Sequence, residues 1–253
     1  MISASPLAGV PEIQAGTDLG ELIAKLTAAG PQAEQLAPGD ILVIAHKIVS
    51  KTEGRVRRLG GVTPSERAVE LARLGDRDPR VMEVVLQETR VIVRAAPGVI
   101  VCETHHGFIC ANAGVDRSNV PGEDAILMLP LDPDRSARTI RARLRELTGV
   151  APGIVISDSF GRAWRNGQTD IAIGLAGVRG LDDWRGRPDA QGRRMRATVI
   201  AVADLLAGTA DLARAKDASQ PVVLIRGAAQ HVTSQDGPGV APLLRARSHD
   251  LFR

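Results

Sequence analysis

Apolar residues recur along the chain with two spacings, and these predict its strands and helices. Short continuous runs rich in β-branched residues predict buried strands at 41–45, 91–95, 99–103, 125–129, 153–159, 171–175 and 221–226. Apolar positions every three or four residues predict amphipathic helices at 18–29, 64–74, 79–88, 133–147 and from the apolar run 198–203 to about 215. Residues 7–13, which include Pro11, fit either a short strand or an extended segment.

Residues that favour helix ends stand where these periodic stretches begin and stop. Asp18, Thr63 and Asp132 are candidate N-caps, and Pro64 and Pro133 fall at first-turn positions, where a missing N–H costs nothing. Gly149 follows the helix at 133–147 and is suited to the left-handed position that ends a helix.

The order of the predicted elements indicates the fold class. The strands between about 91 and 129 follow one another without intervening helices, which favours an α+β fold with mixed or antiparallel sheets and packed helices over a doubly wound sheet. Neither GxGxxG nor GxxxxGK[ST] occurs, so a Rossmann or P-loop nucleotide site is not supported.

Length and composition describe an ordinary globular protein. The 253 residues suffice for one large domain or two small ones, with 44% hydrophobic and 24% charged residues. No apolar run approaches the roughly 20 residues that span a bilayer, and the first residues lack the features of a signal peptide. A cytoplasmic protein without a membrane partner is therefore expected.

The basic residues are almost all arginines. Only four lysines occur, and the arginines form separate patches near 55–58, 135–145 and 185–196. With three Phe, two Trp and no Tyr, the chain offers few aromatic groups for stacking on bases. Anionic small substrates explain the arginines more economically than nucleic acid. Cys102 and Cys110 lack zinc-site spacing and are expected to be buried thiols.

Residues 110–122 are the stretch most suggestive of a site. This segment joins two predicted strands and combines small residues with Asp116 and Asn119. Asp158 and Ser159 end another predicted strand. Two carboxylates and a hydroxyl on strand-end loops suit Mg²⁺ or Mn²⁺, whereas the alternative is an Asx turn at Asp116 and a cap or ion pair at Asp158.

Other polar residues have both a functional and a structural interpretation. Lys47 and Lys51 follow the 41–45 strand and are either phosphate-binding ammonium groups or surface lysines. Asn119 either reads a base edge or occupies a turn. The polar stretch 161–170, with Arg162 and Arg165, is either an anion clamp or a surface loop. His105 and His106 are adjacent, so on a strand they point to opposite faces and are poor joint metal ligands.

Several of these segments together resemble the coenzyme F420-0:L-glutamate ligase family, also called F420:γ-glutamyl ligases. The matching strings are 54–58, 63–68, 110–120, 129–134, 156–162, 166–170 and 222–227. They cover nearly the whole chain in the right order. The chain is thus identified as a bacterial stand-alone member with a single domain over 1–253. It is similar to the ligase half of a two-domain actinobacterial enzyme, without the nitroreductase-like half.

The resemblance implies a GTP-dependent ligase. Such an enzyme adds L-glutamate to coenzyme F420-0, and then γ-linked glutamates, through an acyl phosphate. It also implies two divalent ions (Mg²⁺ or Mn²⁺), stimulation by K⁺ and an intertwined homodimer. Two alternatives stay open: a related amide ligase acting on another phosphorylated acid, and a non-catalytic protein that binds F420 or GTP.

The resemblance also assigns residues by position. Asp116 and Asp158 would hold the first metal, Ser159 would touch the second, and Lys51 would share the catalytic role with the two aspartates. The implied nucleotide site comprises Val10, Pro11, Glu12, Ile13, His46, Lys47, Lys51, Asn119, Arg214, Ala215, Lys216 and Asp217. Arg162 and Arg165 are candidates for holding F420-0 or glutamate.

One position departs from the family pattern. Archaeal members carry an acidic metal ligand where Lys216 stands in this chain. Either the second metal has other ligands, such as Asp217, or Lys216 supplies part of its charge near the phosphates.

Overall fold

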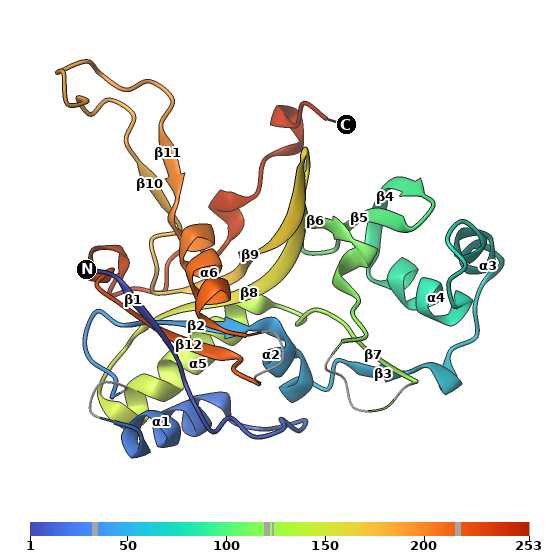
Figure 1. Cartoon of the computed structure of the whole chain (residues 1–253), viewed down its shortest axis with the longest axis horizontal. Coiled ribbons are helices and arrows are strands. Elements are labelled where there is room, and N and C mark those ends of the chain that lie inside the picture. The colour runs from blue at the N-terminus through green and yellow to red at the C-terminus, as the bar shows by residue number, and fades with distance from the viewer. Residues whose placement is uncertain (32–34, 119–121, 123, 216–218, 253) are drawn as a thin grey trace.

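A five-stranded mixed sheet forms the centre of the fold (Figure 1). The computed structural model describes residues 1–31, 35–118, 122, 124–215 and 219–252. The strands lie in the order β1-β12-β2-β8-β9, and only β2 and β8 run parallel. Their bounds are β1 Ser3–Pro6, β12 Val222–Arg226, β2 Ile41–Ala45, β8 Gly153–Arg162 and β9 Arg165–Ala176.

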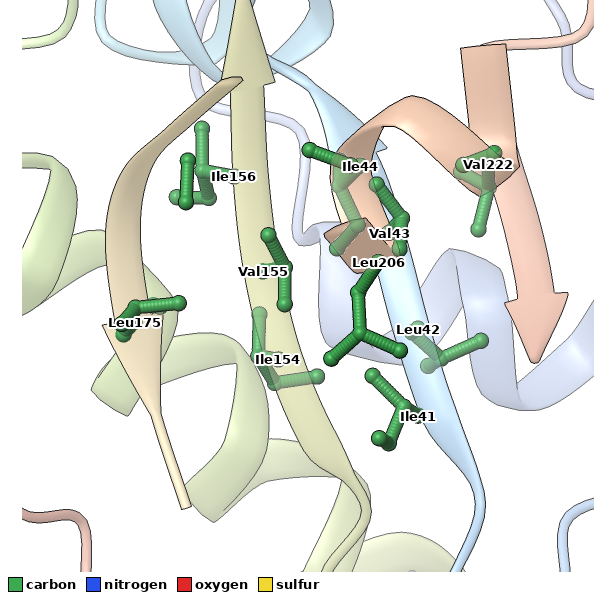
Figure 2. Close-up of a cluster of buried hydrophobic side chains, with 14 of the residues drawn as sticks. Ile41, Leu42, Val43, Ile44, Ile154, Val155, Ile156, Leu175, Leu206 and Val222 are labelled. Atoms are coloured by element: carbon green, nitrogen blue, oxygen red, sulfur yellow. The ribbon is translucent and has the colours of Figure 1, made fainter. Parts of the chain in front are cut away.

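Helices cover both faces of this sheet (Figure 1). Helix α5 (Pro133–Thr148), backed by α1 (Leu19–Ala29), packs on one face, and α6 (Val202–Ala213) packs on the other. Every residue of Ile41–Ile44 is therefore buried, which explains why β2 is continuously apolar. Figure 2 shows Leu206 of α6 beside side chains of β2 and β8 in this core.

Substitutions of two adjacent leucines of α6 test the packing of the core directly. Leu206 is buried in the cluster, whereas Leu205 is 62% exposed. Leu206→Ala is expected to lower the free energy of unfolding by about 2–5 kcal/mol, because it leaves a cavity. Leu205→Ala, the matched control on the same helix, is expected to change it by less than about 0.5 kcal/mol. Urea denaturation measures both, and equal effects would contradict this packing.

A second group of elements lies beside the central sheet and has its own apolar clusters. It contains the three-stranded sheet β4-β5-β6, the pair β3–β7 and helices α3 and α4. The bounds are β3 Val56–Arg58, α3 Glu66–Arg73, α4 Pro79–Gln87, β4 Thr89–Ala96, β5 Val99–Thr104, β6 Ile109–Ala111 and β7 Ala125–Leu127. Helix α2 (His46–Thr52) leads from β2 toward this group.

Strands β10 (Leu181–Asp183) and β11 (Val199–Ala201) form a hairpin arm that extends away from the body (Figure 1). The connection between them carries five arginines. Short 3-10 turns lie at Leu59–Gly61, Asn112–Gly114, Ala229–His231, Ala241–Leu243 and Arg247–His249. Among the helices of the described residues, none has the length and apolarity needed to cross a membrane.

The α+β class with mixed and antiparallel sheets is confirmed. The cap and stop of α5 are also as predicted, since Asp132 accepts from Arg135 N–H and Gly149 is left-handed. For α3 the predicted cap Thr63 is wrong. The cap is Ser65, whose hydroxyl accepts from Ala68 N–H, so Pro64 precedes the helix instead of opening it. The segment 7–13 forms no strand.

The polar stretch 161–170 is not the surface loop considered as one interpretation. Strands β8 and β9 continue through most of it as a long hairpin, with Trp164 at φ 66° in its turn. Backbone pairing between the two strands, and not apolar patterning, sustains this extension. Both cysteines are buried free thiols, as predicted.

Candidate active site

A pocket of about 980 Å³ opens at the carboxyl ends of the parallel strands β2 and β8. Segments far apart in the sequence meet there. Its lining consists of residues 10–13, 45–48, 51, 110–112, 114–116, 118, 157–161, 168, 170, 214, 215 and 219–221. The pocket therefore brings together most of the residues that the sequence singled out.

A left-handed turn directs the 110–118 segment into the pocket. Asn112, Ala113 and Gly114 have φ values of 53°, 53° and 73°. A Cβ on Gly114 would lie 2.6 Å from the Leu129 side chain, so glycine is required both for its conformation and for this packing. After the turn, Asp116 pairs with Leu127 through two backbone hydrogen bonds, which fix where its carboxylate projects.

Asp116 is already bound to a cation of the chain itself. Lys47 Nζ lies 2.6 Å from Asp116 Oδ2. The Ser118 backbone N–H and hydroxyl donate to the same carboxylate at 2.8 and 2.7 Å. Burial alone would raise the pKa of Asp116, but the hydrogen bonds from Lys47 and Ser118 outweigh it and lower that pKa. Asp116 is thus a carboxylate, and Lys47 is its ammonium partner.

Helix α2 presents Lys51 to the pocket on the same face as Lys47, one turn later. The Lys51 side chain is largely buried, and its Nζ donates to Glu12 Oε1 at 2.6 Å. Glu12 belongs to the 10–13 segment, so this pair connects that segment to α2. Two ammonium groups, each paired with a carboxylate, therefore lie on one helix face at the pocket wall.

Asp158 stands on β8 across the pocket. Its Oδ1 accepts from the Ser159 backbone N–H at 2.8 Å and lies 3.2 Å from His46 Nε2. His46 is buried, and its other ring nitrogen is 3.2 Å from Ser50 Oγ. Both of these contacts of Asp158 use its Oδ1.

Asp170 is a pocket residue that the sequence reasoning did not assign. It is 2% exposed on β9 and accepts hydrogen bonds from Ser157, Ser159 and Arg214. The string 166–170 had drawn attention to this region, but Asp170 faces the pocket only because the β8–β9 register places it opposite Ser159.

The other predicted residues fall into two groups. Arg162 and Arg165 lie near the exposed tip of the β8–β9 hairpin, outside the pocket lining, and Arg162 donates to Asn166 O. Asn119, Lys216 and Asp217 lie outside the described residues, so their roles stay predictions. His105 and His106 contact backbone carbonyls away from the pocket.

The oxygen atoms in the pocket wall fit a divalent cation that takes only some of its ligands from the protein and the rest from substrate and water. No group of three or more His, Cys, Asp or Glu side chains is clustered for a metal among the described residues. Asp116, Asp158 and Ser159 instead offer a few oxygen atoms along the pocket wall. Mg²⁺ typically takes one or two carboxylates and completes its shell with phosphate oxygens and water.

Burial also determines the protonation state of the Cys110 thiol. Burial, with a smaller effect of the Asp158 charge, raises the pKa of Cys110 to about 12. The Cys110 thiol in the pocket wall is therefore protonated at neutral pH and is not a nucleophile.

Fold and pocket together define an α+β protein with a pocket lined by carboxylates and ammonium groups at the end of its central sheet. The family model described as F420-0:Gamma-glutamyl ligase matches residues 9–227. This chain belongs to that family.

Archaeal relatives extend the match over nearly the full chain. The coenzyme F420:L-glutamate ligase of Methanopyrus kandleri is 44% identical over 244 residues, 96% of this chain and 94% of the relative. The protein of the same name from Methanothermobacter thermautotrophicus is 42% identical over 254 residues, 100% and 99% of the two chains. That from Archaeoglobus fulgidus is 40% identical over 223 residues, 88% and 86% of the two chains. These relatives are archaeal, whereas the resemblance had suggested a bacterial form.

Proposed function

We propose that this chain catalyses the GTP-dependent ligation of L-glutamate to coenzyme F420-0, and then the addition of γ-linked glutamate to F420-1. The observation that carries the proposal is the meeting of Asp116, Asp158 and two lysines in one pocket. It is supported by relatives that are named coenzyme F420:L-glutamate ligase. Two divalent ions, Mg²⁺ or Mn²⁺, and stimulation by K⁺ are part of the same proposal.

The reaction needs a phosphoryl transfer followed by amide formation. The γ-phosphoryl of GTP moves to the terminal carboxylate of F420-0, which gives GDP and an acyl phosphate. The glutamate amine then attacks the acyl carbon, the bond to phosphate breaks and the amine loses a proton. Positioning and neutralisation of charge are the protein's main contributions to such chemistry.

Residues of the pocket are suited to both contributions. Lys47 and Lys51 would contact phosphate oxygens from one face of α2, and the 10–13 segment would line the nucleotide beside them. Asp116, Asp158 and Ser159 would hold the divalent ions, which when bound would neutralise charge on the phosphates. His46 would restrain Asp158 through its contact with Oδ1.

We assign Arg162 and Arg165 to the anionic groups of F420-0 or glutamate. Both side chains are exposed at the tip of the hairpin whose base lines the pocket, so a large substrate could reach them. Arg162→Gln and Arg165→Gln are each expected to raise KM for F420-0 or glutamate by about tenfold, because each removes a hydrogen bond to a charged group. Steady-state kinetics check this, and unchanged KM for both substrates would refute it.

A homodimer is part of the proposal. The projecting β10–β11 arm and the exposed side chains of Trp164, Leu251 and Phe252 offer surface for a second copy. Light scattering on a sizing column is expected to give twice the mass of one chain, and a single-chain mass would contradict the dimer.

An omission experiment tests the proposed reaction. Continuous GDP formation is expected only when F420-0, glutamate, GTP and Mn²⁺ are all present, with K⁺ increasing the rate. Without glutamate, GDP formation should stop after about one turnover per site, when the acyl phosphate has formed. Replacing F420-0 by other phosphorylated acids tests the related amide ligase, which would show higher activity with one of them. Binding of F420-0 and GTP without GDP formation would instead indicate the non-catalytic protein.

A further inference from the structure

Asn112 lies in the pocket wall and has no role in the reaction as described so far. It begins the 3-10 turn Asn112–Gly114, in the left-handed stretch that leads to Asp116. Its φ of 53° suits asparagine, but Ala113 beside it has the same φ with only a methyl side chain. The left-handed conformation alone therefore gives little reason for an amide at this position.

The Asn112 side chain is held by an arginine from a distant part of the sequence. Arg77 lies in the turn between α3 and α4, where its backbone N–H donates to Ala72 O at 3.1 Å. Its Nη1 donates to Asn112 Oδ1 at 2.5 Å, and its Nη2 donates to Gly98 O in the β4–β5 turn. Arg77 is thus held at its backbone and at its guanidinium group, and it holds Asn112 in turn.

The contact with Arg77 determines which end of the Asn112 amide is available. A guanidinium group only donates hydrogen bonds, so the amide oxygen faces Arg77 and the NH₂ group is turned away from it. Within the described part of the chain, Asn112 Nδ2 donates to no protein atom, and it is not one of the buried polar atoms that lack a partner. Because Asn112 lines the pocket, Nδ2 is the donor that it offers to a bound molecule.

The charge of Arg77 favours an anionic partner for this donor. A cation that donates to an amide oxygen polarises the amide, and hydrogen bonds linked in this way strengthen one another. Lys47 and Lys51 in the same pocket are each paired with a carboxylate of the chain. Asn112 Nδ2 has no such partner among the described residues, so an incoming oxygen displaces no side chain from it.

We propose that Asn112 binds an anionic oxygen of a substrate through Nδ2, and that Arg77 is the positioning residue that sets the orientation of this amide. The inference rests on the proposed function, because the substrates of that reaction supply such oxygens. GTP offers phosphate oxygens, and F420-0 and glutamate offer carboxylates.

Two substitutions separate the Asn112 donor from the conformation of the turn. Asn112→Asp keeps an oxygen for Arg77 and a residue type that tolerates positive φ, but it lacks the NH₂ group. Asn112→Gly also suits a φ of 53° and removes the donor without adding a charge. A loss that both variants share is therefore the loss of the donor.

Isothermal titration calorimetry with Mn²⁺ present measures the binding of GTP, of F420-0 with GDP, and of L-glutamate with GDP and F420-0. Both Asn112 variants are expected to bind the same one of these ligands about tenfold more weakly, as for the loss of a hydrogen bond to a charged group. The other two ligands should bind as to the wild type. The ligand affected identifies the source of the anionic oxygen.

Variants of Arg77 test its positioning role. Arg77→Met should weaken the same ligand, and Arg77→Lys should weaken it less, because an ammonium group still donates. Arg77→Met combined with Asn112→Gly should be no weaker than Asn112→Gly alone, because Arg77 acts through Asn112. Arg80→Met is the matched control. Arg80 lies in the first turn of α4, pairs with Asp78 at 2.7 Å and lies outside the pocket lining, so its replacement should change none of the three affinities.

The inference and the proposed function fail in different ways. Wild-type affinity for all three ligands in Asn112→Gly would overturn the inference, and so would a loss in Asn112→Asp alone, which the added charge would explain. Additive losses in the double variant would refute the positioning role of Arg77. Failure of the wild type itself to bind any of the three ligands would instead refute the proposed function.

Discussion

Asp158→Asn is expected to lower kcat/KM for glutamate ligation by about 10²–10³-fold, the size of effect seen when one preorganised electrostatic group is removed. Asparagine keeps an oxygen that can accept the Ser159 N–H, so the local backbone should be retained. What is lost is the negative charge that would hold a divalent cation near the transferring phosphoryl group.

Glu70→Gln is the control for this variant. Glu70 is an exposed glutamate of α3, paired with Arg67 and outside the pocket lining. Its replacement should leave kcat/KM within about twofold of the wild type, as for surface substitutions away from a site. If Asp158→Asn also stays within that range, Asp158 does not carry charge in the reaction.

Lys47→Met is expected to have opposite effects on the binding of GTP and on the binding of Mn²⁺. In the structure Lys47 Nζ lies 2.6 Å from Asp116 Oδ2. The ammonium group therefore takes a position from which a divalent cation would otherwise contact the carboxylate. Removing the ammonium should raise KM for GTP by about tenfold or more, because a hydrogen bond to a charged group contributes about 1.5–3 kcal/mol. The same variant should bind Mn²⁺ more tightly without nucleotide, because a competing cation is gone.

Opposite changes in the two affinities are the distinguishing result. GTP affinity follows from steady-state kinetics, and Mn²⁺ affinity from electron paramagnetic resonance of the free ion. Lys25→Met, at an exposed surface pair with Glu21, should change neither quantity. Weaker Mn²⁺ binding in Lys47→Met would show that Lys47 supports the metal site and does not compete with a cation for Asp116.

The sequence predicted best the elements whose surroundings are uniform. Strand β2 is buried on both faces, so its apolar run is continuous and its bounds were predicted as observed. Helix α5 carries strong end signals at Asp132 and Gly149. By contrast α2 has only seven residues, and three of them, Ile48, Val49 and Thr52, are β-branched, so no local pattern indicated a helix.

The site was predictable where polar residues end a strand or enter a distinctive loop, as at Asp158 and Asp116. Their part in one pocket came from the family resemblance and from the parallel pairing of β2 and β8. Asp170 could not be found in this way. Its position opposite Ser159 depends on register shifts near Ser157 and Arg162, which are set by strand pairing and not by local composition.

The most direct test is the mass of the product made by the purified chain. The protein is incubated with F420-0, L-glutamate, GTP and Mn²⁺, and the mass of the coenzyme is then measured by mass spectrometry. The account predicts a gain of one glutamyl residue per molecule of GTP converted to GDP, and no gain with Asp158→Asn over the same time. Unchanged coenzyme mass with the folded wild type would contradict it.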